Sequence, residues 1–227
     1  MEVKEKFLCG EALTSYETYQ TIQYLINQSR IENNVLDDDL MKCEECAIWI
    51  CRDTLCINRY PFNFNIFNTK DLGFKDNFHY FSIVEFNTLN GRKNFIIDPV
   101  FEQFNTDKYR YTDDKIIDAK DSFNNDEDFL NRLSKERYLE LTEKNVYKYI
   151  SGLVTLGNQV SNNIEVSKAL SNFNKKLDKN NLCYSKGEDL LINEQQIIGE
   201  NRLKLIAILK KERDSLINLE NNTRKIK

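Results

Sequence analysis

The residues with the clearest capacity for chemistry are a cysteine, a histidine and an aspartate that follow one another along the chain. His79 is the only histidine, and it lies in the aromatic stretch 78–84, where a solvent-exposed histidine would be out of place. Asp98 ends an apolar segment, immediately before Pro99. A thiol hydrolase needs a thiolate nucleophile, an imidazole that accepts and returns a proton, and a group that orients the imidazole. Cys43, His79 and Asp98 could fill these roles in that order.

Both members of the His79 and Asp98 pair also have a purely structural interpretation. His79 would then be a core histidine bonded to a backbone carbonyl, and Asp98 would start a turn ahead of proline. The two together favour chemistry, because burying an aspartate is costly unless a partner donates hydrogen bonds to it. We therefore predict His79 as the base and Asp98 as its orienting group.

Cys43 is the predicted nucleophile because it falls where a helix should begin, and a helix N-terminus stabilises a thiolate. The neighbouring Glu44 and Glu45 would oppose ionisation, so activation should depend largely on a protonated His79. The other cysteines of this stretch are predicted to be small core residues of the same helix: Cys46, Cys51 and Cys56.

A metal site is a competing interpretation of the four clustered cysteines, which form the series C-x2-C-x4-C-x4-C. Zinc sites usually pair two knuckles separated by a loop. This series instead lies on an unbroken apolar helical pattern that would point the thiols in different directions. We therefore predict neither a metal ion nor a cofactor.

Hydrophobic periodicity predicts an α+β fold in which helix dominates. A capping box at 14–17 predicts a helix over about 14–30, and a second helix should follow from Cys43 to about residue 55. Aromatic and β-branched residues predict three strands, near 62–66, 78–86 and 94–97. Four later helices are expected near 126–134, 136–155, 161–178 and 193–218.

The last two strands should form an antiparallel hairpin, whose register decides whether His79 and Asp98 meet. A two-residue turn at Asn90-Gly91 would place Ile83 opposite Asp98, whereas a loop over 87–90 would place His79 there. The predicted triad requires the longer loop or an equivalent bulge.

Composition and charge bound the class of protein. The 227 residues are 41% hydrophobic with a net charge of −4, and the positive residues are scattered, which argues against nucleic-acid binding. We expect no secretion signal and no membrane span, because no basic N-terminal segment precedes an apolar run and no apolar run approaches about 20 residues. Clustered cysteines are unlike a disulfide framework, so we expect reduced thiols in a reducing compartment, cytoplasmic or reached by delivery into a host cell.

The segments that carry Cys43, His79 and Asp98 resemble those of the papain-like and transglutaminase-like cysteine enzymes, especially the glutamine deamidases among bacterial effectors and toxins. The segment Cys43–Cys51 is similar to their nucleophile helix, and His79–Val84 and Phe95–Pro99, followed by Gln103-Phe104, are similar to their histidine and aspartate strands. No glycine directly precedes Cys43 and no upstream glutamine has the papain spacing, so the Cys43 backbone amide is the one oxyanion donor we suggest.

The resemblance implies a thiol-dependent hydrolase that acts on a protein amide through a thioester, with glutamine deamidation as the leading activity. Proteolysis and acyl or amine transfer by the same fold are alternatives. The resemblance also implies a core in which the nucleophile helix packs on a small antiparallel sheet. We expect this catalytic core to span 1–110 and a helical region over 111–227 to pack on it. From another class, the chain could be a helical adaptor that binds a partner through its helix at 194–219.

Overall fold

Helices and one antiparallel sheet make up the α+β fold of the chain, seen in a computed structural model that describes residues 6–7, 9–35, 42–55, 63–105, 127–158 and 163–185. Contacts divide the chain into two units, Met1–Glu188 and Asp189–Lys227, and all described residues belong to the first. The described elements are α2 (Ser15–Glu32), α3 (Cys43–Leu55), β1 (Phe64–Asn68), β2 (Tyr80–Thr88), β3 (Gly91–Ile97), η1 (Phe101–Asn105), α5 (Glu127–Glu136), β4 (Tyr138–Glu140), α6 (Glu143–Asn158) and α7 (Asn163–Lys179).

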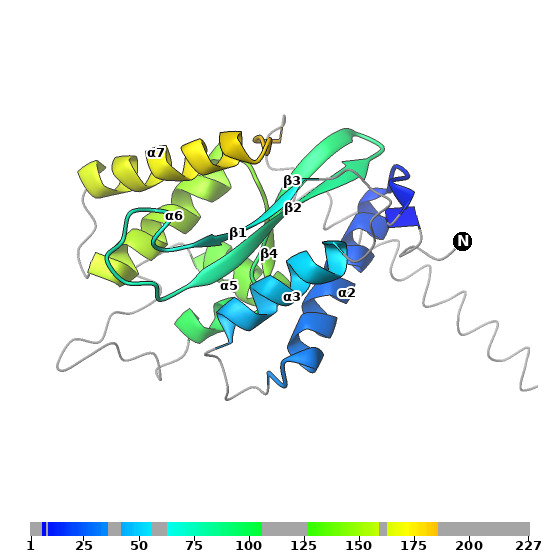
Figure 1. The fold of residues 1–227 in the computed structure, drawn as a ribbon, viewed down its shortest axis with the longest axis horizontal. Coiled ribbons are helices and arrows are strands. Elements are labelled where there is room, and N and C mark those ends of the chain that lie inside the picture. The colour runs from blue at the N-terminus through cyan, green and yellow to red at the C-terminus, as the bar shows by residue number, and fades with distance from the viewer. Residues whose placement is uncertain are drawn as a thin grey trace, which may run out of the picture. The chain divides into compact units, whose positions relative to one another are not determined.

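The sheet has four strands in the order β1-β2-β3-β4, and each strand runs antiparallel to its neighbours (Figure 1). The three predicted strands are confirmed as β1, β2 and β3. Their alternating aromatic and β-branched side chains suit a sheet that is covered on both faces.

The fourth strand, β4, corrects the prediction of one continuous helix over 136–155. Arg137 has a left-handed backbone conformation (φ 57°), which ends α5 at Glu136. The next three residues pair with β3, and α6 then begins at Glu143, where the Thr142 hydroxyl accepts a hydrogen bond from the Asn145 N–H. The residues after this short strand have helical periodicity, so the sequence pattern predicted helix across the strand as well.

The register of the β2–β3 hairpin differs from both predicted alternatives. Thr88 pairs with Gly91 across a two-residue turn at Leu89-Asn90, and Ser82 pairs with Ile97. Gly91, directly after this turn, adopts φ +96°, a backbone conformation that glycine takes up readily. Continuing this register places Phe81, not His79 or Ile83, opposite Asp98.

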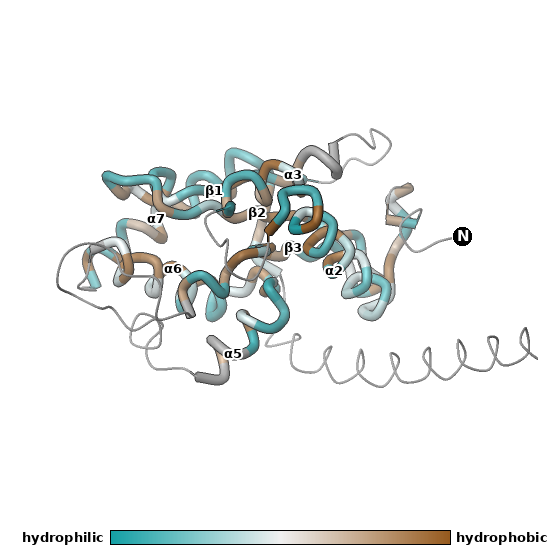
Figure 2. The backbone as a smooth tube through the Cα atoms, turned by 90° about the horizontal axis from the view of Figure 1, so that it is seen from below, coloured by the Kyte–Doolittle hydropathy of each residue, from teal (hydrophilic) through white to brown (hydrophobic). Residues whose placement is uncertain are grey.

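Two groups of helices cover opposite faces of the sheet. The Ser82 hydroxyl donates to the Ala47 carbonyl of α3 at 3.1 Å, whereas the ring of the next residue, Phe81, packs on Tyr149 of α6. Because adjacent residues of a strand point to opposite faces, α3 and α6 lie on different sides of the sheet. Figures 1 and 2 show the same division, with α2 and α3 on one side and α6 and α7 on the other.

Apart from the segment that forms β4, the predicted helices are confirmed where they fall on described residues. The Thr14 and Glu17 capping box starts α2, and α3 begins at Cys43 as expected. The later segments form α5, α6 and α7, so the region after the hairpin is largely helical. The predicted helix at 193–218, on which the adaptor hypothesis depended, lies outside the described residues. No helix among the described residues is long and apolar enough to cross a membrane.

The expected domain boundary at residue 110 stays a prediction. It falls inside the first unit, Met1–Glu188, and in a stretch that lies outside the described residues. Segments on both sides of it are joined in one sheet, since β4 pairs with β3.

Phe81 offers a test of the packing between the sheet and the helices behind it. Its fully buried ring contacts Phe67, Phe173 and Tyr149. We expect Phe81→Ala to lower the free energy of unfolding by about 3–5 kcal/mol, measured by urea denaturation, because the cavity cannot fully close. Ile164→Ala is the control and should change it by less than about 0.5 kcal/mol, since Ile164 is 80% exposed. Equal effects of the two substitutions would contradict the packing.

Candidate active site

His79 and Asp98 form a fully buried pair at the end of the sheet. The His79 Nε2 atom lies 2.7 Å from the Asp98 Oδ2 atom, and both side chains have no solvent exposure. His79 immediately precedes β2 and Asp98 immediately follows β3, two positions out of direct opposition. Such diagonal neighbours have Cα atoms about 7–8 Å apart, which a histidine and an aspartate side chain can span. The pair therefore forms without the longer loop that the predicted triad required.

Three further residues, from η1 and α6, contact the imidazole. The Tyr149 hydroxyl of α6 donates to Asp98 Oδ2 at 2.7 Å and lies 3.3 Å from His79 Nε2. The side-chain amide of Gln103, in η1, lies 2.8 Å from His79 Nδ1. The Phe104 ring meets the imidazole edge to face, with 4.7 Å between centroids. Both imidazole nitrogens are thus engaged, which fixes the plane of the ring.

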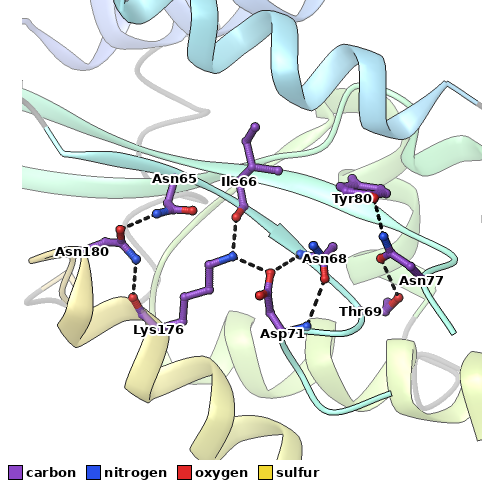
Figure 3. A network of polar contacts seen from close by, with 9 residues as sticks. All are labelled: Asn65, Ile66, Asn68, Thr69, Asp71, Asn77, Tyr80, Lys176 and Asn180. Atoms are coloured by element: carbon purple, nitrogen blue, oxygen red, sulfur yellow. Dashed lines mark hydrogen bonds and ion pairs between the residues drawn. The ribbon is translucent and has the colours of Figure 1, made fainter. Parts of the chain in front are cut away.

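Thr69 organises the loop that delivers His79 to this position. Its backbone N–H donates to the His79 carbonyl at 3.2 Å, its hydroxyl donates to the Asp76 carbonyl at 3.0 Å, and the Phe78 N–H donates to the same hydroxyl. Figure 3 shows the neighbouring network, in which Lys176 of α7 contacts Asp71 and the Ile66 carbonyl of β1. The loop before His79 is therefore fixed at the start of β2 and tied to α7.

An ion-pair network holds the turn that carries Asp98 and Gln103. Glu102 accepts from Arg30 of α2 at 2.5 Å and from Arg137 at 3.0 Å, and Arg30 also donates to the Pro99 carbonyl. The Asp98 carbonyl accepts a hydrogen bond from the Phe101 N–H, so Asp98 also starts a turn, as its structural interpretation predicted. This network fixes the turn between α2 and β4.

Opposing electrostatic effects act on the buried imidazole. Burial by itself lowers the pKa of His79. The charge of Asp98 and its hydrogen bond, together with a hydrogen bond and an electrostatic interaction with Cys43, raise this pKa to about 10. Burial raises the pKa of Tyr149 well above its ordinary value, and the charge of Asp98 adds to this. Tyr149 is therefore a neutral hydrogen-bond donor to Asp98, and Asp98 favours the charged form of His79.

Cys43 opens α3 beside this pair. It is half-buried, and the Lys42 carbonyl just before it accepts the Cys46 N–H at 3.0 Å. The N–H groups of a first helical turn have no partners within the helix, so they favour negative charge near the Cys43 sulfur. The structure thus brings the three predicted site residues, Cys43, His79 and Asp98, into one cluster.

The other described cysteines of α3 differ from Cys43. Cys46 and Cys51 are buried, and burial raises the pKa of each thiol to about 12. Both are core residues, as predicted, while Cys56 lies outside the described residues. No group of three or more histidine, cysteine, aspartate or glutamate side chains in the described part of the chain is placed to hold a metal ion.

A further polar group interacts with Cys43. Tyr80, the first residue of β2, shares hydrogen bonds with Asn77 and with Glu44 of α3. Burial raises the pKa of the Tyr80 hydroxyl, and the charges of Glu44 and Cys43 add to that rise. Tyr80 therefore connects the histidine loop to the first turn of α3.

Sequence reasoning had missed two residues that contact this site. Gln103 was noted within the resembling segment but given no role, and Tyr149 was only part of a predicted helix. One signal could have identified Tyr149: it shares a buried helix face with Val146 and Leu153, and a buried tyrosine hydroxyl needs a hydrogen-bond partner. No comparable pattern distinguishes Gln103.

Comparisons of the chain with protein families, with curated proteins and with solved structures find no match.

Asp98→Asn should reverse the direction in which the His79 pKa is shifted. Without the carboxylate charge, burial dominates, so we expect the pKa to fall from about 10 to below its ordinary value of about 6.5. The measurement is a long-range ¹H–¹⁵N NMR titration, which is unambiguous because the chain has one histidine. A pKa that stays near 10 in the variant would mean that Asp98 is not the cause.

Alkylation by iodoacetamide should separate the thiols by environment. At pH 6 we expect Cys43 to react faster than the exposed Cys9 and Cys183, because an imidazolium beside it stabilises the thiolate. Cys46 and Cys51 should stay unmodified in the folded chain. Site-resolved mass spectrometry measures the rates, and His79→Ala should remove the advantage of Cys43. Fast modification of Cys46 would contradict the assignment of the nucleophile.

Proposed function

We propose that this chain is a thiol-dependent hydrolase that acts on an amide of a protein substrate, with glutamine deamidation as its leading activity. The observation that carries the proposal is the buried His79–Asp98 pair beside Cys43 at the start of α3. These three groups supply a nucleophile, an acid–base group and an orienting carboxylate.

The reaction has two halves. The Cys43 thiolate attacks the carboxamide carbon, the C–N bond breaks, and the His79 imidazolium gives its proton to the departing ammonia. A thioester joins Cys43 to the substrate. Neutral His79 then takes a proton from water as the water oxygen attacks the thioester, and the carboxylic acid and the thiolate are released. Asp98 keeps the ring oriented and offsets its positive charge in both halves.

The negative oxygen formed in each half needs hydrogen-bond donors. We assign this role to the backbone N–H of Cys43, because the first amides of a helix have no partners within it and the helix dipole favours negative charge there. The same helix end therefore serves both the thiolate and the oxyanion.

The arrangement of elements supports a papain-like or transglutaminase-like core. A helix that begins with the nucleophile packs on an antiparallel sheet, and adjacent strands of that sheet supply the histidine and the aspartate in the order Cys, His, Asp. A reduced thiol suits a reducing compartment, and the five described cysteines are thiols. We assign the protein substrate to the surface around Cys43, to which Tyr80 and Glu44 belong.

Peptide-bond cleavage and transfer to an amine would use the same three groups, so the test must report all of these reactions. Protein extracts are treated with the wild-type chain, and mass spectrometry scores glutamines converted to glutamate, new N-termini and amine cross-links. We expect converted glutamines with the wild type and none with Cys43→Ala. Loss of the nucleophile should reduce the rate by about 10⁴-fold or more.

Cys9→Ala is the matched control, since Cys9 is an exposed cysteine outside the site. It should retain the full activity. New N-termini that depend on Cys43 would identify a protease instead, and cross-links would identify a transferase. Modification that persists unchanged in Cys43→Ala would overturn the thiol mechanism.

A further inference from the structure

Gln103 occupies the imidazole nitrogen that the proposed reaction needs. Nε2 of His79 faces Asp98, so the proton exchanged with substrate and water must pass through Nδ1. The Gln103 side-chain amide lies 2.8 Å from that same Nδ1, and Cys43 also interacts with the ring. Gln103 and Cys43 therefore both contact the imidazole.

A carboxamide can pair with Nδ1 in both of its protonation states. When His79 is neutral, Nδ1 carries a lone pair and accepts a hydrogen bond from the Gln103 NH₂ group. When His79 is charged, Nδ1 carries a proton and can donate it to the Gln103 oxygen after the amide makes a half-turn. A glutamate could only accept, and an aliphatic side chain could do neither.

Gln103 is buried, so the half-turn of its side-chain amide is the main movement open to it. The side chain is 1% exposed, and its backbone N–H donates to the Val100 carbonyl at 3.0 Å within η1. The adjacent Glu102 is fixed by Arg30 and Arg137. The amide is therefore held against the imidazole through both halves of a reaction in which the ring changes its charge.

We propose that Gln103 is a positioning residue that supports both protonation states of His79 by turning its amide, so that one imidazole can act first as acid and then as base. This inference rests on the proposed thioester chemistry, which requires the two states in succession. It predicts that an acceptor-only side chain at position 103 holds His79 in the charged state and selectively slows the half that needs the neutral base.

The first test measures the His79 proton directly by NMR. Asp98→Asn should bring the His79 titration below neutral pH, and Gln103→Glu is added in that background. A carboxylate at hydrogen-bond distance should raise the His79 pKa by about 1–3 units relative to Asp98→Asn alone. Gln20→Glu introduces the same charge on a partly exposed residue of α2 and should leave the titration unchanged.

Gln103→Met gives a second reading if the glutamate variant does not fold. It removes both the donor and the acceptor, so in the Asp98→Asn background the neutral ring should gain the tautomer with the proton on Nδ1, read from the ring ¹⁵N shifts. An unchanged pKa in the glutamate variant, or an unchanged tautomer ratio in the methionine variant, overturns the proposal.

The second test separates the two halves of the reaction with p-nitrophenyl acetate, an ester that acylates reactive thiols. In the chain with Asp98 intact, Gln103→Glu should keep the burst of nitrophenolate but slow the later steady release by about tenfold or more, because release needs neutral His79. Cys43→Ala should abolish the burst, and Gln20→Glu should match the wild type. Equal slowing of burst and release overturns the proposal.

The two tests distinguish failure of this inference from failure of the proposed function. If the wild type gives no burst, the thiol mechanism fails, and the NMR titration alone decides whether Gln103 controls the His79 proton. If the burst is normal and the His79 pKa does not change when Gln103 is replaced, the thiol mechanism is supported and the proposed role of Gln103 is wrong.

Discussion

The buried contact between His79 and Asp98 constrains the structure around it more than any other interaction. Neither side chain has any solvent exposure, so each depends on the other to offset the cost of removing a charge from water. Breaking such a pair by removing one member costs about 3–5 kcal/mol in proteins, because the remaining charge stays buried. Tyr149 shares the Asp98 oxygen and Gln103 satisfies the second imidazole nitrogen, which stabilises the pair further.

This pair explains why so many elements converge at one end of the sheet. Asp98 and His79 extend from the ends of adjacent antiparallel strands, which places them together without any special loop. Thr69 fixes the segment before His79, and Glu102 fixes the turn after Asp98. Helix α6, which comes much later in the sequence, contributes Tyr149. The rigid sheet sets the distances, and these side chains hold the ring in one plane.

The described thiols of α3 differ in how deeply they are buried. Cys46 and Cys51 face the core, where the desolvation of a thiolate is too costly, whereas Cys43 lies half-buried at the helix N-terminus. The N-terminus of a helix and a positive charge on His79 would both favour negative charge there. Gln103 contacts the same imidazole, so His79 interacts with both a thiol and an amide.

Local patterns in the sequence determined the elements: the capping box of α2, the start of α3 at Cys43, three strands and the later helices, together with Cys43, His79 and Asp98 as the residues to examine. These features depend on neighbours within a few positions, so a single sequence contains them. Only the tertiary structure decided three further features: the register of the β2–β3 hairpin, the formation of β4, and which side chains contact the imidazole. The hairpin turn at Leu89-Asn90 sets the diagonal contact of His79 with Asp98, β4 exists only because β3 offers it hydrogen bonds, and Gln103 and Tyr149 approach the ring from distant segments. Such long-range contacts follow from how the whole chain packs, which no local pattern records.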